Sequence, residues 1–108
     1  MSSDVLLTFG YSTLSNRVKN ISFPQRSANR EIIVLVQNPN EESYVFDTPQ
    51  TKLVELKSRG VAKSRNAAIE NTTTEYLLFG DDDIEFKEES INAALEYLQS
   101  NPDISILL

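Results

Sequence analysis

The sequence predicts an α/β fold in which a mostly parallel sheet is flanked by helices. Short apolar segments rich in β-branched and aromatic residues alternate with segments of helical spacing. Strands that alternate with helices pair in parallel through right-handed crossovers. Acidic residues gather directly after one apolar segment, where open α/β sheets bind their ligands. The 108 residues, 40% of them hydrophobic, suffice for one compact domain, so we expect a single domain over residues 1–108.

The first part of the chain is predicted to supply two buried strands with a helix between them. Asp4 to Phe9 is a short apolar run that meets Gly10, which indicates a strand followed by a tight turn. Thr13 to Ile21 places apolar residues at helical spacing, so we expect a helix there. Glu31 to Gln37 contains five successive apolar residues and is expected to be a central strand that ends at Asn38.

The middle of the chain is expected to supply an edge strand and a second helix. Tyr44 to Phe46 is interpreted as a short extended piece, and Lys52 to Leu56 partly alternates polar and apolar side chains, as edge strands do. The alanine-rich segment from Gly60 to Glu75 favours a helix, which the three threonines at 72–74 should end.

The last third is expected to contain a strand, a helix and another strand. Glu75 to Phe79 is a short apolar strand that runs straight into Gly80 and three aspartates. Apolar residues at helical spacing predict an amphipathic helix from Glu88 to Ser100, which Pro102 prevents from continuing. Asp103 to Leu108 is a strand-like apolar run.

Composition excludes several kinds of site. Without cysteine or histidine there are no disulfides, thiolate nucleophiles, zinc–thiolate sites or imidazole bases, so any metal must be held by oxygen. A net charge of −6 argues against a nucleic-acid partner, because phosphate-backbone affinity depends on clustered Lys and Arg. No segment approaches the roughly 20 apolar residues of a membrane span. We therefore expect a cytoplasmic protein that is at most peripheral to a membrane.

Charge is unevenly distributed in the second half of the chain. Lys52 to Arg65 holds five basic residues and one acidic residue, whereas Asp81 to Glu89 holds six acidic residues and one basic residue. This pattern suits an anion bridged by a cation, although solvated surfaces give the same pattern. An EF-hand loop starting at Asp81 is excluded, since Phe86 stands where that loop needs glycine.

Three adjacent carboxylates, Asp81 to Asp83, follow a buried strand. Their mutual repulsion favours compensation by a divalent cation such as Mn²⁺ or Mg²⁺, which keeps coordination sites open for phosphates. The implied ligand is a diphosphate. The alternative is structural: the aspartates provide a turn and favourable negative charge before the next helix.

The residue order from Gly60 to Phe86 resembles the core signature of family 2 inverting glycosyltransferases, which have the GT-A fold. Val5 to Phe9 and Ile32 to Val36 look like the first two strands of that family. The resemblance implies the Rossmann-like half of a GT-A enzyme that binds a nucleotide-diphosphate sugar. The matching parts of the signature are Gly60, Ser64-Arg65-Asn66, Ala67 to Ile69, Glu75-Tyr76, Leu77 to Phe79 and Asp81 to Asp83.

Acidic site residues follow from this resemblance by position. Asp81 and Asp83 match the outer members of the DxD motif and are expected to bind the metal that bridges both phosphates. Asp82 or Asp81 would face the ribose or the sugar.

Other donor-binding residues also follow from the resemblance. Arg65 matches a basic position that approaches the nucleotide, although it would equally be a charge on a helix surface. Thr8 and Phe9 match residues that line the base pocket, where Phe9 either stacks on uracil or fills the core. Asn38 is expected to contact the nucleotide, but the sequence Gln37-Asn38 stands where the family usually has an acidic residue that reads the base.

The implied activity is transfer of a sugar from a nucleotide-diphosphate donor, with a UDP-sugar favoured, to a hydroxyl of a glycan or lipid-linked acceptor, as in polysaccharide biosynthesis. The acceptor half and its general base lie beyond the aspartates in this family, so we expect a truncated domain whose catalytic base is unknown. A non-catalytic module that self-associates through an exposed sheet edge or through Asp103 to Leu108 is the alternative. A nucleotidyltransferase shares the metal and diphosphate chemistry but lacks this residue order.

Overall fold

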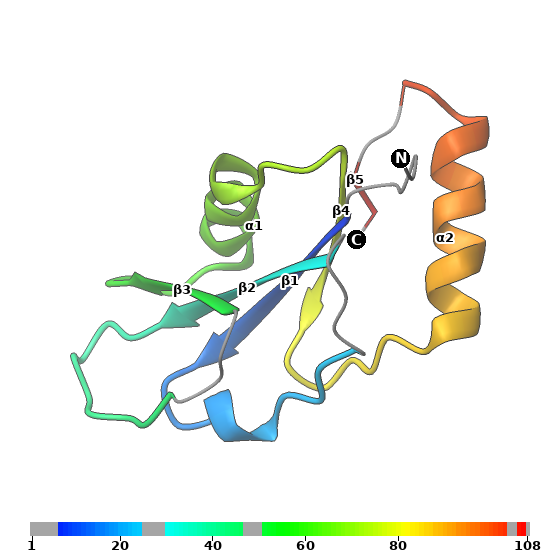
Figure 1. Ribbon diagram of the computed structural model, residues 1–108. Coiled ribbons are helices and arrows are strands. Elements are labelled where there is room, and N and C mark those ends of the chain that lie inside the picture. Colours follow the sequence, from blue (N-terminus) through cyan, green and yellow to red (C-terminus); the bar gives the residue numbers. More distant parts are fainter. Residues whose placement is uncertain (1–6, 25–29, 47–50, 104–105, 108) are drawn as a thin grey trace.

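The chain folds into a five-stranded parallel sheet with one α-helix on each face, as seen in a computed structural model that describes residues 7–24, 30–46, 51–103 and 106–107 (Figure 1). The predicted α/β class is therefore confirmed. In chain order the elements are β1 (Leu7–Leu14), η1 (Val18–Asn20, a 3-10 helix), β2 (Arg30–Gln37), β3 (Thr51–Leu56), α1 (Val61–Asn71), β4 (Tyr76–Asp81), α2 (Glu88–Ser100) and β5 (Ile106–Leu107).

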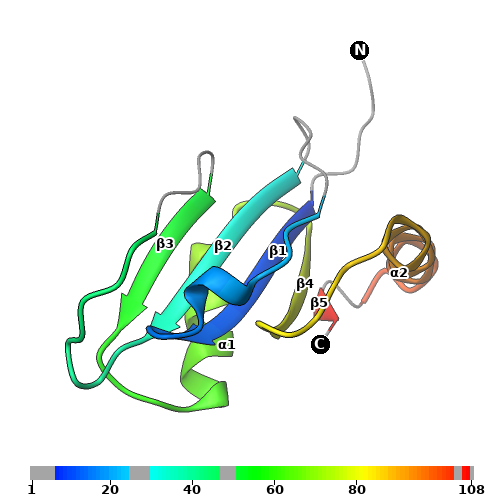
Figure 2. The same ribbon diagram turned by 90° about the horizontal axis from the view of Figure 1, so that it is seen from below.

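The strand order is β3-β2-β1-β4-β5, and all neighbouring strands are parallel (Figure 2). The register pairs Leu14 with Gln37, Gln37 with Leu56, and Ser12 with Asp81, so the carboxyl ends of four strands meet at one edge. Because β2 and β3 lie to one side of β1 while β4 and β5 lie to the other, the chain changes direction across the sheet at β1. Open α/β sheets bind ligands at such a switch point.

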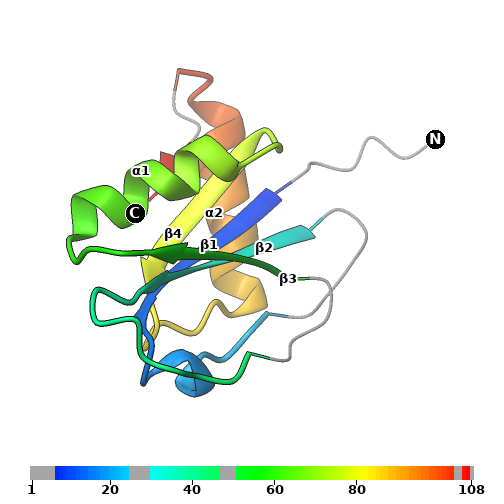
Figure 3. The ribbon, with the colours of Figure 1, turned by 90° about the vertical axis from the view of Figure 1, so that its left-hand side faces the viewer.

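The two faces of the sheet bury separate apolar clusters, since side chains alternate along each strand. On the α1 face, Ile33 and Leu35 pack with Ala68. On the α2 face, Ile32 and Val34 pack in the cluster that includes the inward side of that helix. Figure 3 shows the sheet between the two helices. The buried helix residues of the second cluster are Ile91 and Leu98.

Aromatic side chains extend the cluster on the α2 face. The ring of Phe86, in the segment between β4 and α2, lies with its centroid 5.1 Å from that of Phe9 and 5.5 Å from that of Tyr11. Phe23 meets Tyr11 edge-on at 5.5 Å. These contacts hold the segment that follows the aspartates against the sheet, so the position of that segment is set by core packing.

Gly10 lies in the middle of β1 and does not begin a turn, so the predicted end of the first strand at Phe9 is wrong. Its neighbours across the sheet are Ile33 and Phe79. A Cβ atom added at Gly10 would lie 3.1 Å from Cδ1 of Phe79 and 3.3 Å from Cδ1 of Leu77. The glycine is therefore needed for close packing, and the strand continues to Leu14.

Two further local predictions are also wrong. The helix expected from Thr13 to Ile21 is reduced to Val18–Asn20, because Thr13 and Leu14 are paired with β2 as the last residues of β1. The piece from Tyr44 to Phe46 is irregular and pairs with no strand of the described sheet.

The remaining elements are confirmed, with small changes at their ends. β2, β3, α1 and α2 lie where the patterns predict them. β4 runs two residues further than expected and ends at Asp81. Within the run from Asp103 to Leu108, the pair Ile106–Leu107 forms a short edge strand against β4. Residues 104, 105 and 108 of this run lie outside the described residues, as do residues 4–6 of the first expected strand.

Within the described ranges, no helix has both the length and the apolar character needed to cross a membrane.

Candidate functional site

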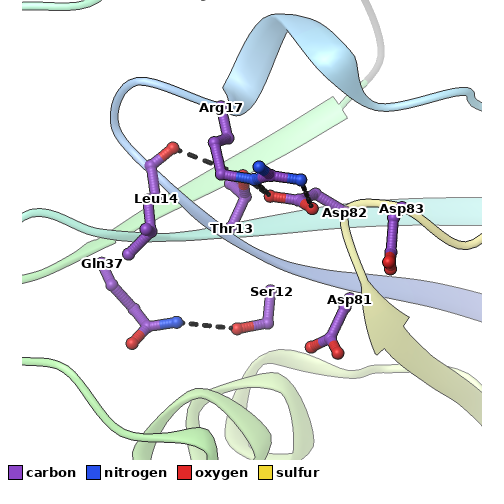
Figure 4. A pocket seen from close by; sticks show the side chains of 8 residues that line it. All are labelled: Ser12, Thr13, Leu14, Arg17, Gln37, Asp81, Asp82 and Asp83. Carbon is purple, nitrogen blue, oxygen red and sulfur yellow. Dashed lines mark hydrogen bonds and ion pairs between the residues drawn. The ribbon is translucent and has the colours of Figure 1, made fainter.

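A hollow of about 310 Å³ lies at the carboxyl ends of β1 and β4, where the order of the strands reverses (Figure 4). We call it the aspartate hollow. Its position follows from the register, which pairs Ser12 with Asp81 and thereby brings the ends of the two strands together. The residues that line it are Ser12, Thr13, Leu14, Arg17, Gln37, Asp81, Asp82 and Asp83.

Asp82 is held by three hydrogen bonds from β1 and the loop after it. Arg17 donates through Nε to Oδ2 at 2.9 Å and through Nη2 to Oδ1 at 3.0 Å, and Thr13 Oγ1 donates to Oδ2 at 2.7 Å. Only 7% of Asp82 is exposed. The hydrogen bond from Arg17 is the main reason why the pKa of Asp82 lies below its ordinary value and why the pKa of Arg17 is raised. The pair is therefore ionised at neutral pH.

Asp81 and Asp83 differ from the residue between them. Both are exposed, and in Figure 4 their carboxylates point away from Arg17 while that of Asp82 points toward it. Among the residues that the structure describes, no side chain binds either carboxylate. A backbone hydrogen bond of 3.2 Å from Ile84 N to Asp81 O closes the turn that carries the three aspartates.

The donor set of the aspartate hollow fits partial coordination of a hard cation. No group of three or more acidic side chains is arranged to hold a metal ion in the described part of the chain. Two carboxylates nevertheless remain free on one side of the hollow, and Mg²⁺ in phosphate-handling sites is typically held by one or two carboxylates plus phosphates and water. Asp81 and Asp83 are the residues that could hold such an ion.

A second hollow of about 110 Å³ adjoins the first at the carboxyl end of β2. We call it the asparagine hollow. Asn38 is 2% exposed, and its amide closes the following loop: Nδ2 donates to the Glu42 carbonyl at 2.8 Å, and the Glu42 N–H donates to Oδ1 at 2.9 Å. Ser15 Oγ donates to the Glu42 carboxylate at 3.1 Å. The residues that line the asparagine hollow are Leu14, Ser15, Asn16, Gln37, Asn38, Pro39, Asn40, Glu42 and Arg59.

Gln37 lies between the two hollows and lines both. Its Nε2 donates to Ser12 Oγ at 3.0 Å, and its Oε1 accepts the Gly60 N–H at 2.8 Å. Gly60 has a φ of 138°, a conformation that side-chain-bearing residues rarely adopt, and it is the residue before α1. One amide therefore connects the ends of β1 and β2 with the start of α1.

Comparison with known proteins identifies the family to which this chain belongs. The profile described as glycosyl transferase family 2 matches residues 16–108, a range that contains all three aspartates. The chain belongs to glycosyl transferase family 2. A protein of Haemophilus influenzae described as an uncharacterized glycosyltransferase is 32% identical over 88 residues, which cover 77% of this chain and 29% of that protein. No solved structure matches the chain with significance.

The family 2 chain thus has the Rossmann-like α/β architecture of a GT-A nucleotide-binding half, and it spans about 29% of the length of its curated relative. Of the residues expected to form the site, Asp81, Asp82 and Asp83 lie together in the aspartate hollow, and Asn38 lines the neighbouring one. Arg65 is half-buried on α1 and lines neither of these hollows.

Thr8 and Phe9 lie inside the sheet, away from both hollows of the family 2 chain. Each is 0% exposed; Thr8 Oγ1 shares a hydrogen bond of 2.7 Å with Thr74 Oγ1, and Phe9 packs against Phe86. Because β1 continues past Gly10, the residues of this strand that reach the aspartate hollow come later in the sequence. These are Ser12, Thr13 and Leu14, none of which is among the site residues expected from the sequence.

Arg17 and Gln37 are the other residues of the aspartate hollow that are not among those expected from the sequence. A signal for the first exists in the sequence: the run from Ser12 to Arg17 is mostly polar and directly follows an apolar run, as the aspartates do. Its significance was hidden because Gly10 was interpreted as the end of the strand.

Proposed function

We propose that this chain binds the nucleotide-diphosphate sugar of a glycosyltransferase reaction, and that Asp81 and Asp83 would hold a divalent metal that neutralises charge on the donor's diphosphate. The observation that carries this proposal is the pair of exposed carboxylates on one side of the aspartate hollow, at the switch point of the sheet, which no side chain of the described residues binds. Membership of family 2 supports it independently.

The charges of the hollow favour a divalent ion. Asp82 is neutralised by Arg17, which leaves the two negative charges of Asp81 and Asp83 facing the opening. Mn²⁺ or Mg²⁺ matches that charge, and both ions take oxygen ligands while keeping positions for phosphate oxygens. The protein itself provides the orientation of the two carboxylates, because the turn that carries them is closed by its backbone and by Asp82.

The reaction that this arrangement serves is displacement at the anomeric carbon of the sugar. A bond forms from the acceptor hydroxyl to that carbon, and the bond to the nucleoside diphosphate breaks. When bound, the metal neutralises charge that develops on the departing diphosphate. This chain supplies the leaving-group side. The general base and the glycan or lipid-linked acceptor site belong to further residues of the enzyme, in keeping with the 29% of the relative's length that this chain spans.

We place the nucleoside of the donor in the asparagine hollow, which adjoins the phosphate side of the site. The amide of Asn38 is occupied by its own loop, so the acidic group offered to a base is the carboxylate of Glu42. A carboxylate only accepts hydrogen bonds, and the imide N–H of uracil is a suitable donor. Arg59, in the same lining, provides a cation for the carbonyl oxygens or the ribose phosphate. This pairing supports a UDP-sugar as the proposed donor.

Calorimetric titration of UDP with and without Mn²⁺ tests the proposed function. We expect Mn²⁺-dependent binding that Asp83→Ala or Asp81→Asn weakens by more than the roughly 10–100-fold typical of changes around a metal site. Asp103→Asn, which removes an exposed carboxylate after α2, is the matched control and should bind as the unsubstituted chain does. Absence of nucleotide binding at any metal concentration would refute the proposal.

Base specificity is tested in the same instrument. Replacing Glu42 by Gln keeps its size but exchanges one carboxylate oxygen for a donor, so UDP should bind more weakly while affinity for Mn²⁺ alone stays unchanged. Equal weakening of Mn²⁺ binding would place Glu42 near the metal and not near the base.

A second candidate is an interaction module that self-associates through the sheet edge. It is favoured by β3, an edge strand on which Leu53 is 39% exposed. Sedimentation that shows concentration-dependent association, combined with no affinity for nucleotide, would favour this candidate over donor binding.

A further inference from the structure

We propose that Asp82 is a positioning residue that touches neither metal, ribose nor sugar, and that Arg17 and Thr13 hold it so that Asp81 and Asp83 face the donor. This inference rests on the proposed donor site. It assigns roles to two residues outside the aspartate triplet and removes the middle aspartate from the ligand set.

The first argument is the hydrogen bonding of the Asp82 carboxylate. Both of its oxygens accept from Arg17, and Oδ2 also accepts from Thr13. A carboxylate offers about four acceptor positions, so three donors leave little capacity for another ligand. With 7% of the residue exposed, the remaining capacity has little access to the hollow.

The second argument is where the three donors come from. Thr13 belongs to β1, and Arg17 belongs to the loop between β1 and η1, whereas Asp82 directly follows the last residue of β4. The hydrogen bonds therefore join the turn after β4 to the neighbouring strand and its loop. Once the side chain of Asp82 is fixed on that side, the residues before and after it project away from Arg17, as Figure 4 shows.

Arg17 affects metal binding in two opposing ways, through its charge and through the position it gives to Asp82. The two effects predict opposite changes in Mn²⁺ affinity when Arg17 is replaced. As a positive charge in the hollow it repels a cation, so its removal should strengthen Mn²⁺ binding if charge alone matters. As the partner that fixes Asp82 it orients the two free carboxylates, so its removal should weaken binding if position matters. We infer that position dominates, because an exposed charge is screened by water whereas a misplaced ligand is lost.

Manganese titration followed by the paramagnetic resonance of free Mn²⁺ tests this inference in the unsubstituted chain, Arg17→Met, Asp82→Asn and the double variant. We expect each single variant to bind Mn²⁺ roughly 10–100-fold more weakly. The double variant should be no weaker than the weaker single variant, because the two residues act as one unit.

A matched control exists at a distance from the site. Arg30 and Glu88 form another two-fold hydrogen-bonded ion pair, with distances of 2.8 and 2.7 Å. Arg30→Met and Glu88→Gln should leave Mn²⁺ affinity unchanged even where urea unfolding shows a similar loss of stability. If Mn²⁺ affinity falls in proportion to the free energy of unfolding in the variants of both ion pairs, Arg17 and Asp82 have a purely structural role and the inference is overturned.

Thr13→Val provides a milder variant that tests the inference even where Arg17→Met does not fold. It removes the 2.7 Å hydrogen bond with little change of shape, and we expect a smaller but measurable weakening of Mn²⁺ binding. Unchanged or tighter binding in all of these variants would overturn the positioning role while leaving the proposed function intact. Failure of the unsubstituted chain to bind Mn²⁺, with or without UDP, would overturn both.

Discussion

Alanine at Gly80 should be tolerated better than alanine at Gly10, although the nearer clash is at Gly80. A Cβ atom at Gly80 would lie 2.5 Å from Cδ1 of Ile84. That atom is the far end of a side chain that is 39% exposed, so it can rotate toward water. An unfavourable rotamer costs about 0.5–1.5 kcal/mol, and the reduced freedom of the unfolded chain returns about 0.4–1 kcal/mol. The net change should be within about 1 kcal/mol of zero.

At Gly10 the neighbours cannot move away. The added Cβ atom would lie 3.1 Å from Cδ1 of Phe79, 3.3 Å from Cδ1 of Leu77 and 3.5 Å from Cβ of Ala68. All three side chains are buried. Overpacking of a filled core costs about 1–3 kcal/mol, and the same entropic gain of about 0.4–1 kcal/mol offsets part of it. We therefore expect Gly10→Ala to lower the free energy of unfolding by about 1–2 kcal/mol.

Urea unfolding near neutral pH, followed by circular dichroism, measures both effects. With a slope of about 1–3 kcal/mol per molar urea, the midpoint for Gly10→Ala should fall by roughly 0.3–2 M. Gly80→Ala should change it little. Ile84→Ala together with Gly80→Ala is the control that removes the contact. A larger loss of stability for Gly80→Ala than for Gly10→Ala would refute the reasoning. It would mean that the exposed side chain of Ile84 cannot move away, whereas the buried neighbours of Gly10 can.

Three further outcomes are expected. The pKa of Asp82 is held below its ordinary value of 3.8, so its ionised form stabilises the fold above that value. This contribution is lost as pH falls through the lowered pKa, so the acid unfolding of Asp82→Asn should depend less on pH than that of the unsubstituted chain. Burial and the hydrogen bond to Glu55 raise the pKa of Tyr44 to about 12, so stability is lost as pH rises above 10.0, and Tyr44→Phe should remove that loss in alkaline unfolding curves. Leu98→Ala empties a fully buried position on α2 and should cost about 2–5 kcal/mol in thermal unfolding.

Elements whose signals are local could be predicted from the sequence. The helix from Glu88 to Ser100 has the same bounds in the structure as in the prediction, because its apolar spacing and Pro102 define both its face and its end. The continuous apolar run of β2 has no other interpretation at that length. β1 was cut short because glycine marks turns and close contacts alike. Only the neighbours of Gly10 across the sheet show which of the two applies.

The site was predictable where its residues are adjacent in sequence and not where they meet through the fold. Three aspartates after an apolar strand are visible in the sequence itself. The partner of the middle one, Arg17, lies 65 residues away, and no pattern in the sequence connects the two residues. Asn38 was expected to contact the nucleotide, but its amide closes a loop, and that use depends on the path of the chain to Glu42.

The side chain of Gln37 lines both of the hollows that we propose for the donor. Both ends of its amide are hydrogen-bonded, one to Ser12 and the other to the backbone of Gly60, so swinging the side chain aside would break both bonds, and rotating the amide would exchange donor and acceptor. The distance between the two hollows is then set by the edge of the sheet. For the proposed nucleotide-diphosphate sugar, the link between the part in one hollow and the part in the other would therefore have to pass this side chain.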